Sequence, residues 1–362
     1  MSIELRKIIP PNLSYQYLGQ KILCHRSMRF GSPRFDILKI NDKIIANNYG
    51  HGGSGWTIGP GSAEYVNKLL INSEYSKKLN YNTPISIIGA GIIGLFTAYD
   101  LYKKGFKHIT TLADQFEYLV SHNAGGLLAP VSMSNDSEVQ KLIDQLGIDA
   151  YKFFKLIAQG KHQDFKQGVS IVPTYFRDRE HSGLEPYVNI VMKPAKDVLL
   201  DFNNGTTQKM VAYDDGIFID TSLLMQELKS HLKDKVIFKR QKISDFSEIK
   251  SNFIINCSGI GAIKLNHDEK LVPVPGHLIM LKDQNPKHLD HMIFTYLDET
   301  INQHNQHVQR AFYISPKKLS NSKENDIGVI GGSFIKNANY KTPNTEEFEY
   351  IINNAKKFYG IT

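Results

Sequence analysis

Apolar and polar residues alternate along this chain in patterns that predict a mixed α/β protein. A buried strand is expected at 85–88, directly before a glycine-rich turn and an amphipathic helix that Gly105 ends, and a second strand follows at 108–113. Two short apolar runs, a glycine-dense loop and a helix are predicted between residues 36 and 80. Helices are also expected at 136–159, 221–232 and 346–359, and strands at 170–194, 236–238, 253–256, 271–282, 312–314 and 327–331.

The turn after residues 85–88 has the spacing of a dinucleotide-binding site. Residues 89–94 read Gly-Ala-Gly-Ile-Ile-Gly, the pattern G-x-G-x-x-G, between a predicted strand and a predicted helix. The first glycine allows a tight turn, the second lets backbone amides approach a pyrophosphate, and the third lets the helix pack on the strand. Asp114 ends the next strand, where its carboxylate can bind a ribose. The dinucleotide-binding residues expected here are Gly89, Gly91, Ile92, Ile93, Gly94 and Asp114. The motif alone does not distinguish FAD from NAD.

A second glycine-rich segment lies earlier in the chain, at residues 48–58. It contains four glycines within six residues, ahead of a helix that starts near Ser62. A loop without side chains can lay backbone amides against a large planar ligand, and the N-terminus of the following helix adds its positive end. A flexible surface loop is the alternative interpretation, and the position of the segment between an apolar strand and a helix argues against it.

Composition narrows the possible classes of protein. A chain of 362 residues suffices for two or three domains or for one large α/β enzyme, and 41% apolar residues indicate a packed core. Its two cysteines, Cys24 and Cys257, stand far apart, which excludes a disulfide framework and a cysteine-rich metal site. We therefore expect a reducing compartment and no metal. Because no signal sequence and no apolar stretch of membrane-spanning length is found, we expect a cytoplasmic protein.

Positive charge is concentrated near the start of the chain. Residues 1–80 hold eleven lysines and arginines against five acidic residues, and Arg26, Arg29 and Arg34 lie close together. These arginines form no continuous run and are not interleaved with aromatic residues, so no nucleic-acid partner is expected. A small anionic ligand is the expected partner of this segment, and an ordinary solvated basic face is the alternative.

The two glycine-rich motifs together resemble the D-amino-acid oxidase family of FAD-dependent oxidoreductases. Other stretches extend the resemblance over nearly the whole chain: AGGLLAP at 124–130, GVSIV at 168–172, FIINCSGIGA at 253–262, PVPGHLIMLK at 273–282, YISP at 313–316 and GVIGGSF at 328–334. In the family, the G-x-G-x-x-G turn opens the chain and the loop YGHGG-x-G-x-T comes near its end, whereas here the loop precedes the turn. The resemblance therefore implies a circular permutation, which would place Met1 and Thr362 close in space.

The fold that the resemblance implies is an α/β fold of the glutathione-reductase and D-amino-acid-oxidase type. A Rossmann-like FAD-binding domain would be discontinuous, and a second domain with a mixed β-sheet would bind the substrate. The implied FAD-binding segments are 42–72, 84–135 and 212–262, the implied substrate-binding segments are 1–41, 136–211 and 263–362, and 73–83 is the implied linker.

An arginine that binds the substrate carboxylate is also implied. Arg29, within SMRFGSPRFD, matches the family arginine, and a bidentate guanidinium suits a carboxylate. Phe30 stands where the family usually has proline, so Arg26 and Arg34 remain alternatives for this role.

Further active-site roles follow from the resemblance. Tyr313 matches a tyrosine whose hydroxyl assists at the carboxylate, with a buried strand aromatic as the alternative, and Gly53 matches the glycine whose carbonyl orients the amine. A second family tyrosine is Gln309 here, which puts the substrate lid in doubt. We expect His51 to be a packed loop residue rather than a base, and Cys257 to be a buried apolar residue.

Residues in four segments would contact the FAD if the resemblance holds. The glycine loop would line the pyrimidine edge of the flavin, a second segment would wrap around the isoalloxazine ring, and a third would meet the adenine through its backbone. The residues concerned are Gly52, Gly53, Gly55, Trp56, Thr57, Gly125, Gly126, Leu127, Ile243, Ser258 and Gly259.

Oxidative deamination of D-amino acids is the activity that the resemblance implies. A hydride would pass from the substrate Cα to flavin N5, the imine would hydrolyse to a 2-oxo acid and ammonia, and oxygen or another electron acceptor would be reduced, oxygen giving hydrogen peroxide. An oxidase or dehydrogenase of glycine, sarcosine or another N-substituted amino acid is one alternative, and a flavin-binding scaffold without catalysis is another. A preference for D-aspartate would need a second cation, which Arg310 or Arg177 could supply.

Overall fold

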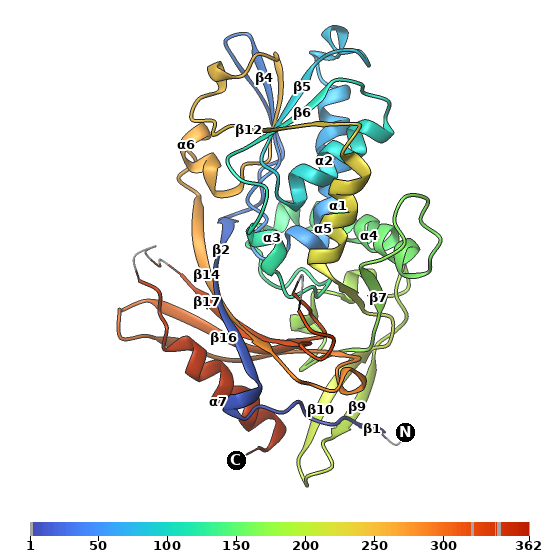
Figure 1. Ribbon diagram of the computed structural model, residues 1–362, viewed down its shortest axis with the longest axis vertical. Helices are drawn as coiled ribbons and strands as arrows, with labels where there is room; N and C mark the ends of the chain where they lie inside the picture. The colour runs from blue at the N-terminus through green and yellow to red at the C-terminus, as the bar shows by residue number, and fades with distance from the viewer. Residues whose placement is uncertain (1–2, 320–321, 337, 339–341, 362) are drawn as a thin grey trace.

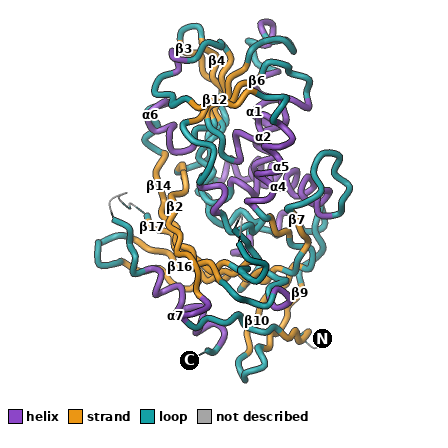
Figure 2. Tube along the Cα trace, in the orientation of Figure 1, coloured by secondary structure: helices purple, strands orange, loops and turns teal. Residues whose placement is uncertain are grey.

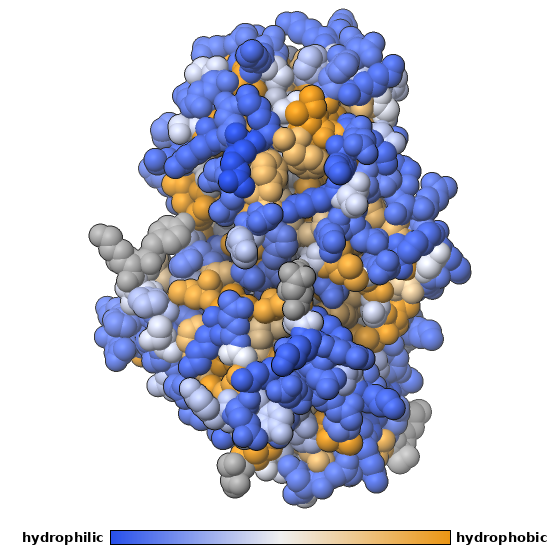
Figure 3. All heavy atoms as spheres, in the orientation of Figure 1, coloured by the Kyte–Doolittle hydropathy of each residue, from blue (hydrophilic) through white to orange (hydrophobic). Residues whose placement is uncertain are grey.

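The computed structural model describes residues 3–319, 322–336, 338 and 342–361, which form two halves (Figure 1). A six-stranded sheet with its helices makes up the upper half in this view, and a nine-stranded sheet crosses the lower half. Figure 2 shows the same division, with most helices beside the upper sheet. Polar residues cover most of the face shown in Figure 3, and apolar residues show through in patches. The expected α/β class is confirmed.

The six-stranded sheet is parallel except for one edge strand. Its order is β12 (Ile237–Arg240), β6 (Ile109–Ala113), β5 (Ile85–Ile88), β13 (Phe253–Asn256), β4 (Lys43–Asn47) and β3 (Ile37–Ile40). The first five strands pair in parallel, and β3 runs antiparallel to β4. Every residue of β5, β13 and β4 is buried, as expected for central strands of a sheet that is covered on both faces.

Helices pack on this sheet through one large apolar cluster. They are α1 (Gly55–Ile71), α2 (Ile92–Lys103), α4 (Ser137–Ala158) and α5 (Thr221–Leu232), with the short α3 (Val120–Asn123) and α6 (Ala262–Asn266) nearby. Leu95 and Phe96 of α2 are fully buried between strand and helix. In α1, Gly61 brings the backbones of α1 and α4 together, because a Cβ at this position would lie 2.3 Å from the carbonyl oxygen of Leu146.

The nine-stranded sheet is mostly antiparallel. Its order is β1 (Glu4–Lys7), β9 (Lys196–Asp201), β10 (Thr207–Tyr213), β8 (Thr174–Phe176), β15 (Met292–Ile301), β16 (His307–Ser315), β17 (Val329–Ile335), β14 (Leu271–Leu281) and β2 (Leu18–Arg29). Among the described residues of this sheet, only β1 with β9 and β15 with β8 pair in parallel. Helix α7 (Glu347–Tyr359) covers one face through a second apolar cluster that includes Phe312 and Phe358. A separate two-stranded sheet joins β7 (Val169–Ile171) and β11 (Ile217–Ile219).

Most elements predicted from periodicity are present. The helices expected at 136–159, 221–232 and 346–359 are α4, α5 and α7. The prediction of strands throughout 170–194 is wrong after β8, because Gly183 has a positive φ of 66° and the chain forms 3₁₀ turns at Glu180–Ser182 and Glu185–Tyr187 instead. The long strand β2 and the hairpin of β9 and β10 were not among the predicted elements.

Both ends of the described chain contact the β9–β10 hairpin. β1 pairs with β9, and the side-chain amide of Asn204 in the hairpin turn donates a hydrogen bond to the carbonyl of Tyr359 at 2.8 Å. Figure 1 shows the two ends at the same end of the molecule. Met1 and Thr362, for which closeness was predicted, lie outside the described residues.

The close approach of α1 and α4 can be tested with Gly61→Ala. We expect the free energy of unfolding to fall by about 1–3 kcal/mol, because the added methyl group forces two packed helices apart. Urea denaturation measures this change. The control, Glu64→Ala, changes a side chain that is 44% exposed on the same helix, and we expect a change below about 0.5 kcal/mol. Equal stability of Gly61→Ala and the wild type would show that the helices tolerate a wider spacing.

Candidate active site

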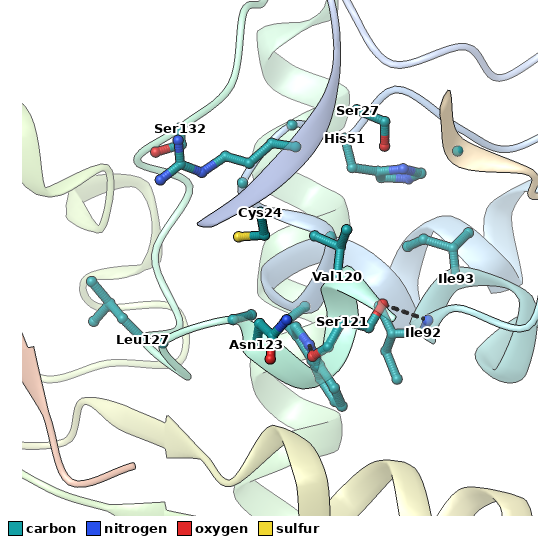
Figure 4. A pocket seen from close by; sticks show the side chains of 18 of the residues that line it. Cys24, Ser27, His51, Ile92, Ile93, Val120, Ser121, Asn123, Leu127 and Ser132 are labelled. Atoms are coloured by element: carbon teal, nitrogen blue, oxygen red, sulfur yellow. Dashed lines mark hydrogen bonds between the residues drawn. The ribbon is translucent and has the colours of Figure 1, made fainter. Parts of the chain in front are cut away.

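A large cavity lies between the two halves, at the carboxyl ends of the parallel strands. The glycine loop after β4, the turn after β5, the segment after β6 and the end of β13 all contribute to its wall. Residues of β2, β14, β15 and β16 close it from the other side. Figure 4 shows side chains from these segments, including Ser121, Asn123 and Ser132, around the cavity. This edge of an open α/β sheet is the common position of a ligand site.

The turn after β5 has the geometry that its glycine motif requires. Gly89 has a φ of 105°, and a Cβ on Gly94 would lie 2.0 Å from the carbonyl oxygen of Gly89. Gly91 precedes the first residue of α2 and has no side chain to cap this helix. The amide of Ile92 donates a hydrogen bond to Ser121 Oγ at 3.0 Å, the dashed line in Figure 4. Asp114 is exposed immediately after β6, the position expected of a ribose-binding carboxylate.

The second glycine loop is packed rather than flexible. Gly50 and Gly52 have positive φ angles of 90° and 58°. A Cβ on Gly52 would lie 2.4 Å from the carbonyl oxygen of Ser132, and the amide of Gly53 donates to that same oxygen at 2.8 Å. The loop therefore fits closely against the segment after β6, and the alternative of a free surface loop is wrong.

A buried ion pair fixes the start of this loop. Asp268, whose side chain is 4% exposed, accepts hydrogen bonds at 2.8 Å from both Arg29 Nε and the Tyr49 hydroxyl. Burial acts to raise the pKa of Asp268, but the hydrogen bonds from Arg29 and Tyr49 outweigh it, so this pKa lies below its usual value. The backbone amide of Arg29 also donates to the carbonyl of Gly50 at 3.2 Å. Arg29 is thus engaged in holding the loop.

Arg26, rather than Arg29, is the arginine that lines the cavity. Arg29 is absent from the cavity wall, whereas Arg26 lies there beside Ser132 and Tyr313. Arg26 Nη1 donates to the carbonyls of Pro275 and Ser333 at 3.2 and 2.9 Å. In β2, Arg29 has the opposite parity to Arg26, and its side chain extends to Asp268 instead. The carboxylate-binding role expected of Arg29 thus stays a prediction, and Arg26, the alternative named above, is the arginine of this segment that the structure places in the cavity wall.

Tyr313 and Gly53 lie in the same cavity as Arg26. A Cβ on Gly53 would be 3.3 Å from Arg26 Cδ, and a Cβ on Gly125 would be 3.2 Å from the Tyr313 hydroxyl. Burial raises the pKa of Tyr313, and the nearby charge of Arg26 partly opposes this increase. The tyrosine is consequently a neutral hydrogen-bond donor at physiological pH.

His51 cannot serve as a base at neutral pH. Its side chain is almost completely buried, and burial lowers its pKa to about 3. Nε2 has no hydrogen-bond partner among the residues that the structure describes. Phe35 packs against the ring at a centroid distance of 5.7 Å. These contacts agree with the expectation of a packed loop histidine.

The remaining predicted residues divide into two groups. The structure places these in the cavity wall: Gly52, Gly53, Gly55, Trp56, Ile92, Ile93, Gly125, Gly126, Leu127 and Gly259. The predicted residues that are not in the wall are Thr57, Ser258, Ile243, Gly89, Gly91, Gly94 and Asp114. Thr57 Oγ1 donates to the carbonyl of Ala129 at 3.0 Å, Ser258 bonds to Asn256, and Ile243 packs on the apolar cluster beside β12.

Both cysteines are also in the wall, and both are buried or nearly so. Burial raises the pKa of the Cys257 thiol to about 12, which makes it unreactive at neutral pH. Burial also raises the pKa of Cys24. Cys24 was not among the predicted site residues. It has the same parity as Arg26 in β2, and this relation becomes visible only once β2 is known to be a strand.

A smaller cavity continues from Arg26 and Tyr313 toward the surface. Val131, Met133, Phe294 and Tyr296 give it an apolar wall, and Gln309 lies at the same place. Tyr296 belongs to β15, and its hydroxyl is 3.5 Å from the carbonyl oxygen of Val131. Strand β15 thus supplies a tyrosine, Tyr296, near Gln309, which stands where the family has a tyrosine. Tyr296 was not among the predicted site residues.

Of the two arginines considered as a second substrate-binding cation, Arg310 lines the smaller cavity and Arg177 does not. Arg310 forms a two-pronged ion pair with Glu347 of α7, at 2.8 and 2.7 Å, and its guanidinium lies 4.1 Å from the centre of the Tyr350 ring. It thus packs against α7, on the opposite face of the sheet from Tyr313. Arg177 is exposed after β8 and is not in the wall. A substrate-binding role for Arg310 or Arg177 stays a prediction, since the structure shows only that the donors of Arg310 are taken by Glu347 and Thr300.

The cavity has the features of a site for an elongated dinucleotide with a planar ring. One end reaches the N-terminus of α2, whose positive end favours a pyrophosphate. The side-chain amide of Asn48 is completely buried in the wall, and neither of its polar atoms has a partner among the described residues. Glycines remove side chains from both sides of the space. No group of three or more metal-ligating side chains occurs within the described residues.

Comparison with known proteins agrees with this geometry. A family model described as FAD dependent oxidoreductase (DAO) matches residues 85–361. The chain belongs to this family. It is therefore an enzyme with FAD as its cofactor, and the cavity described above fits that group. The match begins at β5, so the glycine loop after β4 lies outside it.

Relatives of known activity show how far the similarity extends. A D-amino-acid oxidase of Dictyostelium discoideum is 24% identical over 275 residues, which cover 74% of this chain and 70% of that protein. For a D-amino-acid oxidase of Fusarium vanettenii the identity is 25% over 231 residues, covering 56% of this chain and 61% of the relative.

Solved structures confirm the fold of the family. Iminodiacetate oxidase from Chelativorans sp. BNC1 aligns with a TM-score of 0.55 at 15% identity, covering 76% of this chain and 79% of that structure. Glycine oxidase from Geobacillus kaustophilus aligns with a TM-score of 0.54 at 14% identity, covering 76% and 78%. No helix formed by the described residues is long and apolar enough to cross a membrane.

The buried neutral His51 should make the protein sensitive to acid. Its pKa is about 3 in the folded state and about 6.5 in the unfolded state, so its contribution to stability is fully present above pH 6.5 and is lost as the pH falls toward 3. We expect the free energy of unfolding of the wild type to decrease by about 1.4 kcal/mol per pH unit more than that of His51→Leu below pH 6.

Urea denaturation between pH 7.5 and 4.5 measures this difference. His304→Gln is the control, because the His304 side chain is 41% exposed, and its curve should parallel that of the wild type. Parallel curves for His51→Leu and the wild type would contradict a neutral buried His51.

Proposed function

We propose that this enzyme oxidises D-amino acids to 2-oxo acids and ammonia. The observation that carries the proposal is the placement of Arg26, Tyr313 and Gly53 together in the cavity that fits the cofactor. When bound, FAD supplies the acceptor for the hydride that leaves the substrate α-carbon. With oxygen as the final acceptor, the second product is hydrogen peroxide.

Arg26 has the donors that a carboxylate requires. Its two hydrogen bonds to backbone carbonyls both come from Nη1, so Nε and Nη2 have no partner among the described residues. These two nitrogens form the planar fork that binds both oxygens of a carboxylate. The Tyr313 hydroxyl can donate a further hydrogen bond to the same group.

The rest of the wall favours positioning over proton transfer. The carbonyl of Gly53 can accept a hydrogen bond from the substrate amine, which orients the α-carbon. His51 is neutral and buried, and burial keeps the cysteine thiols protonated. The amine would therefore react in its uncharged form, and its imine product would hydrolyse in water.

Wall composition also supports a substrate with an uncharged side chain. Val131, Met133, Phe294 and Tyr296 surround the outer part of the cavity. The ion pair of Arg310 with Glu347 leaves Arg26 as the arginine with free donors among the described wall residues. Acidic side chains such as that of D-aspartate would lose their hydration without gaining a partner.

Glycine and its N-substituted forms are the second candidate substrates. The contact between the Tyr296 hydroxyl and the Val131 carbonyl oxygen narrows the outer cavity, which favours a small substrate. The fold shared with a glycine oxidase is compatible with this alternative.

Exchange of Arg26 tests the proposal, and Arg29 supplies the matched control. We expect Arg26→Met to lower kcat/KM for the best substrate about 100-fold or more, because the lost charge-assisted pair is worth about 3 kcal/mol. Arg29→Met should instead lower the melting temperature, since it leaves Asp268 buried without its ion pair, and should change kcat/KM less than about tenfold. Anaerobic bleaching of the flavin by D-amino acids, L-amino acids, glycine and sarcosine provides the rates.

The outcomes of this experiment are distinct. Bleaching by D-amino acids that depends on Arg26 supports the first function, and bleaching only by glycine or sarcosine supports the second. A larger loss for Arg29→Met than for Arg26→Met would return the carboxylate site to Arg29.

We also propose that the chain is a circular permutation of the family pattern. Strand β13 lies between β4 and β5, so these two strands need no direct connection to form the sheet. The family match starts at β5 and continues to residue 361, which leaves β4 and its loop in front of it. Residues 73–83 would then be the added linker.

A rearranged chain tests the permutation. It begins at residue 84, continues from residue 362 through a flexible linker to residue 1, and ends at residue 72. We expect it to fold and to bind FAD with a Kd within about tenfold of the wild type, because every strand keeps its neighbours. A control opened within α2 should fail to fold, and failure of both rearranged chains would count against the proposal.

A further inference from the structure

A set of buried side chains holds residues 122–126 of the cavity wall in place, from the side of the wall that faces away from the cavity. The carbonyl of His122 accepts hydrogen bonds from Lys317 Nζ at 2.8 Å and from Thr221 Oγ1 at 3.0 Å. Thr221 Oγ1 also lies 3.3 Å from the carbonyl oxygen of Ala124, and it accepts a hydrogen bond from Lys317 at 2.6 Å. The proposed oxidation uses neither Lys317 nor Thr221.

Strand β16 provides a second anchor next to the first. Ser315 Oγ donates a hydrogen bond to the carbonyl of Gly125. Ser315 lies two residues after Tyr313, so both side chains extend from the same face of β16 toward Gly125. Three side chains from β16, the following loop and α5 thus bind the carbonyl oxygens of His122, Ala124 and Gly125.

These bonds determine where the amides of the wall point. Because a trans peptide is planar, its N–H points away from its carbonyl oxygen. With the carbonyls of Ala124 and Gly125 held from behind, the amides of Gly125 and Gly126 face the opposite way, and both glycines line the cavity. Neither amide makes a hydrogen bond with any residue that the structure describes. Two backbone donors are therefore available to a ligand.

A lysine such as Lys317 is unusual in the buried position behind the cavity wall. Its side chain is fully buried, and no carboxylate among the described residues lies within 4.0 Å of it. Burial lowers its pKa to about 8. The charge of Asp220 offsets this burial only in part, so the buried cation remains costly, and an anion that binds nearby reduces that cost.

We propose that Lys317 is a positioning residue for the cofactor. With Thr221 and Ser315 it turns the amides of Gly125 and Gly126 toward bound FAD, and its positive charge favours negative charge on that group. The inference requires FAD as the cofactor and is independent of the substrate.

Lys317→Met tests both parts of this role without any substrate. We expect the Kd of the apoprotein for FAD, measured by quenching of flavin fluorescence, to rise about tenfold. We also expect the midpoint potential of bound FAD, measured by anaerobic titration with a reference dye, to become more negative, where a tenfold effect on reduction corresponds to about 30 mV for two electrons.

Lys43→Met is the matched control for removing a buried lysine. Lys43 is 9% exposed and donates to the carbonyl of Ser251 at 3.3 Å, at the end of β4 away from the cavity. Its replacement should lower the melting temperature while leaving the Kd for FAD and the potential unchanged. An equal loss of melting temperature in Lys317→Met with wild-type Kd and potential would overturn the proposal.

Two further variants keep the test decisive if Lys317→Met does not fold. Thr221→Val and Ser315→Ala remove hydroxyl anchors and retain the charge of Lys317, so both should raise the Kd for FAD several-fold and leave the potential nearly unchanged. Wild-type Kd values in both variants would refute the positioning role. If these effects are found but no amine bleaches the flavin, the proposed oxidation fails and the role of Lys317 stands.

Discussion

The place of β13 between β4 and β5 is the constraint on which the site depends. All three strands are parallel, so their carboxyl ends lie at one edge of the sheet, and the chain must turn away from that edge after each of them. The glycine loop follows β4, and the G-x-G-x-x-G turn follows β5. The two glycine motifs, which have different expected roles, therefore meet at one cavity. Only the pairing of strands matters for this result. The order of β4 and β5 along the chain does not, which is why a chain with the two motifs reversed can still form the site.

Main-chain contacts, more than side-chain chemistry, shape the cavity. Gly94 packs on the carbonyl of Gly89, and Gly52 packs on the carbonyl of Ser132, at distances that no Cβ could occupy. The first contact fixes the turn between β5 and α2, and the second joins the loop after β4 to the segment after β6. A wall made in this way presents amides and flat surfaces to a ligand. Such a wall suits a cofactor that carries the reactive chemistry itself. The protein then has chiefly to bind and orient the cofactor and the substrate.

Short sequence patterns predicted the parts of the site that lie within one continuous segment of the chain. The strand, turn and helix around residues 85–103 follow from an apolar run and three glycines, and the structure has them as expected. Arg26 shows where this approach ends, because choosing between Arg26 and Arg29 requires knowing that β2 is a strand and which of its faces meets the cavity. The same parity turns Arg310 toward α7 and Tyr313 toward the cavity. Lys317 gave no signal at all, since its burial depends on α5 and the segment at 122–126 packing around it.

The charges around the cavity have one sign among the described residues. Arg26 is the charged side chain of the wall of the large cavity, Lys317 lies behind it, and the N-terminus of α2 adds a positive end, while the charge of Asp268 is paired with Arg29. Burial keeps His51 uncharged and the thiols protonated, so these side chains add no charge to the wall. A cavity of this kind attracts anions at both ends. A diphosphate at α2 and a carboxylate at Arg26 each meet a positive group there, and the uncharged interior between them suits an aromatic ring and an uncharged amine.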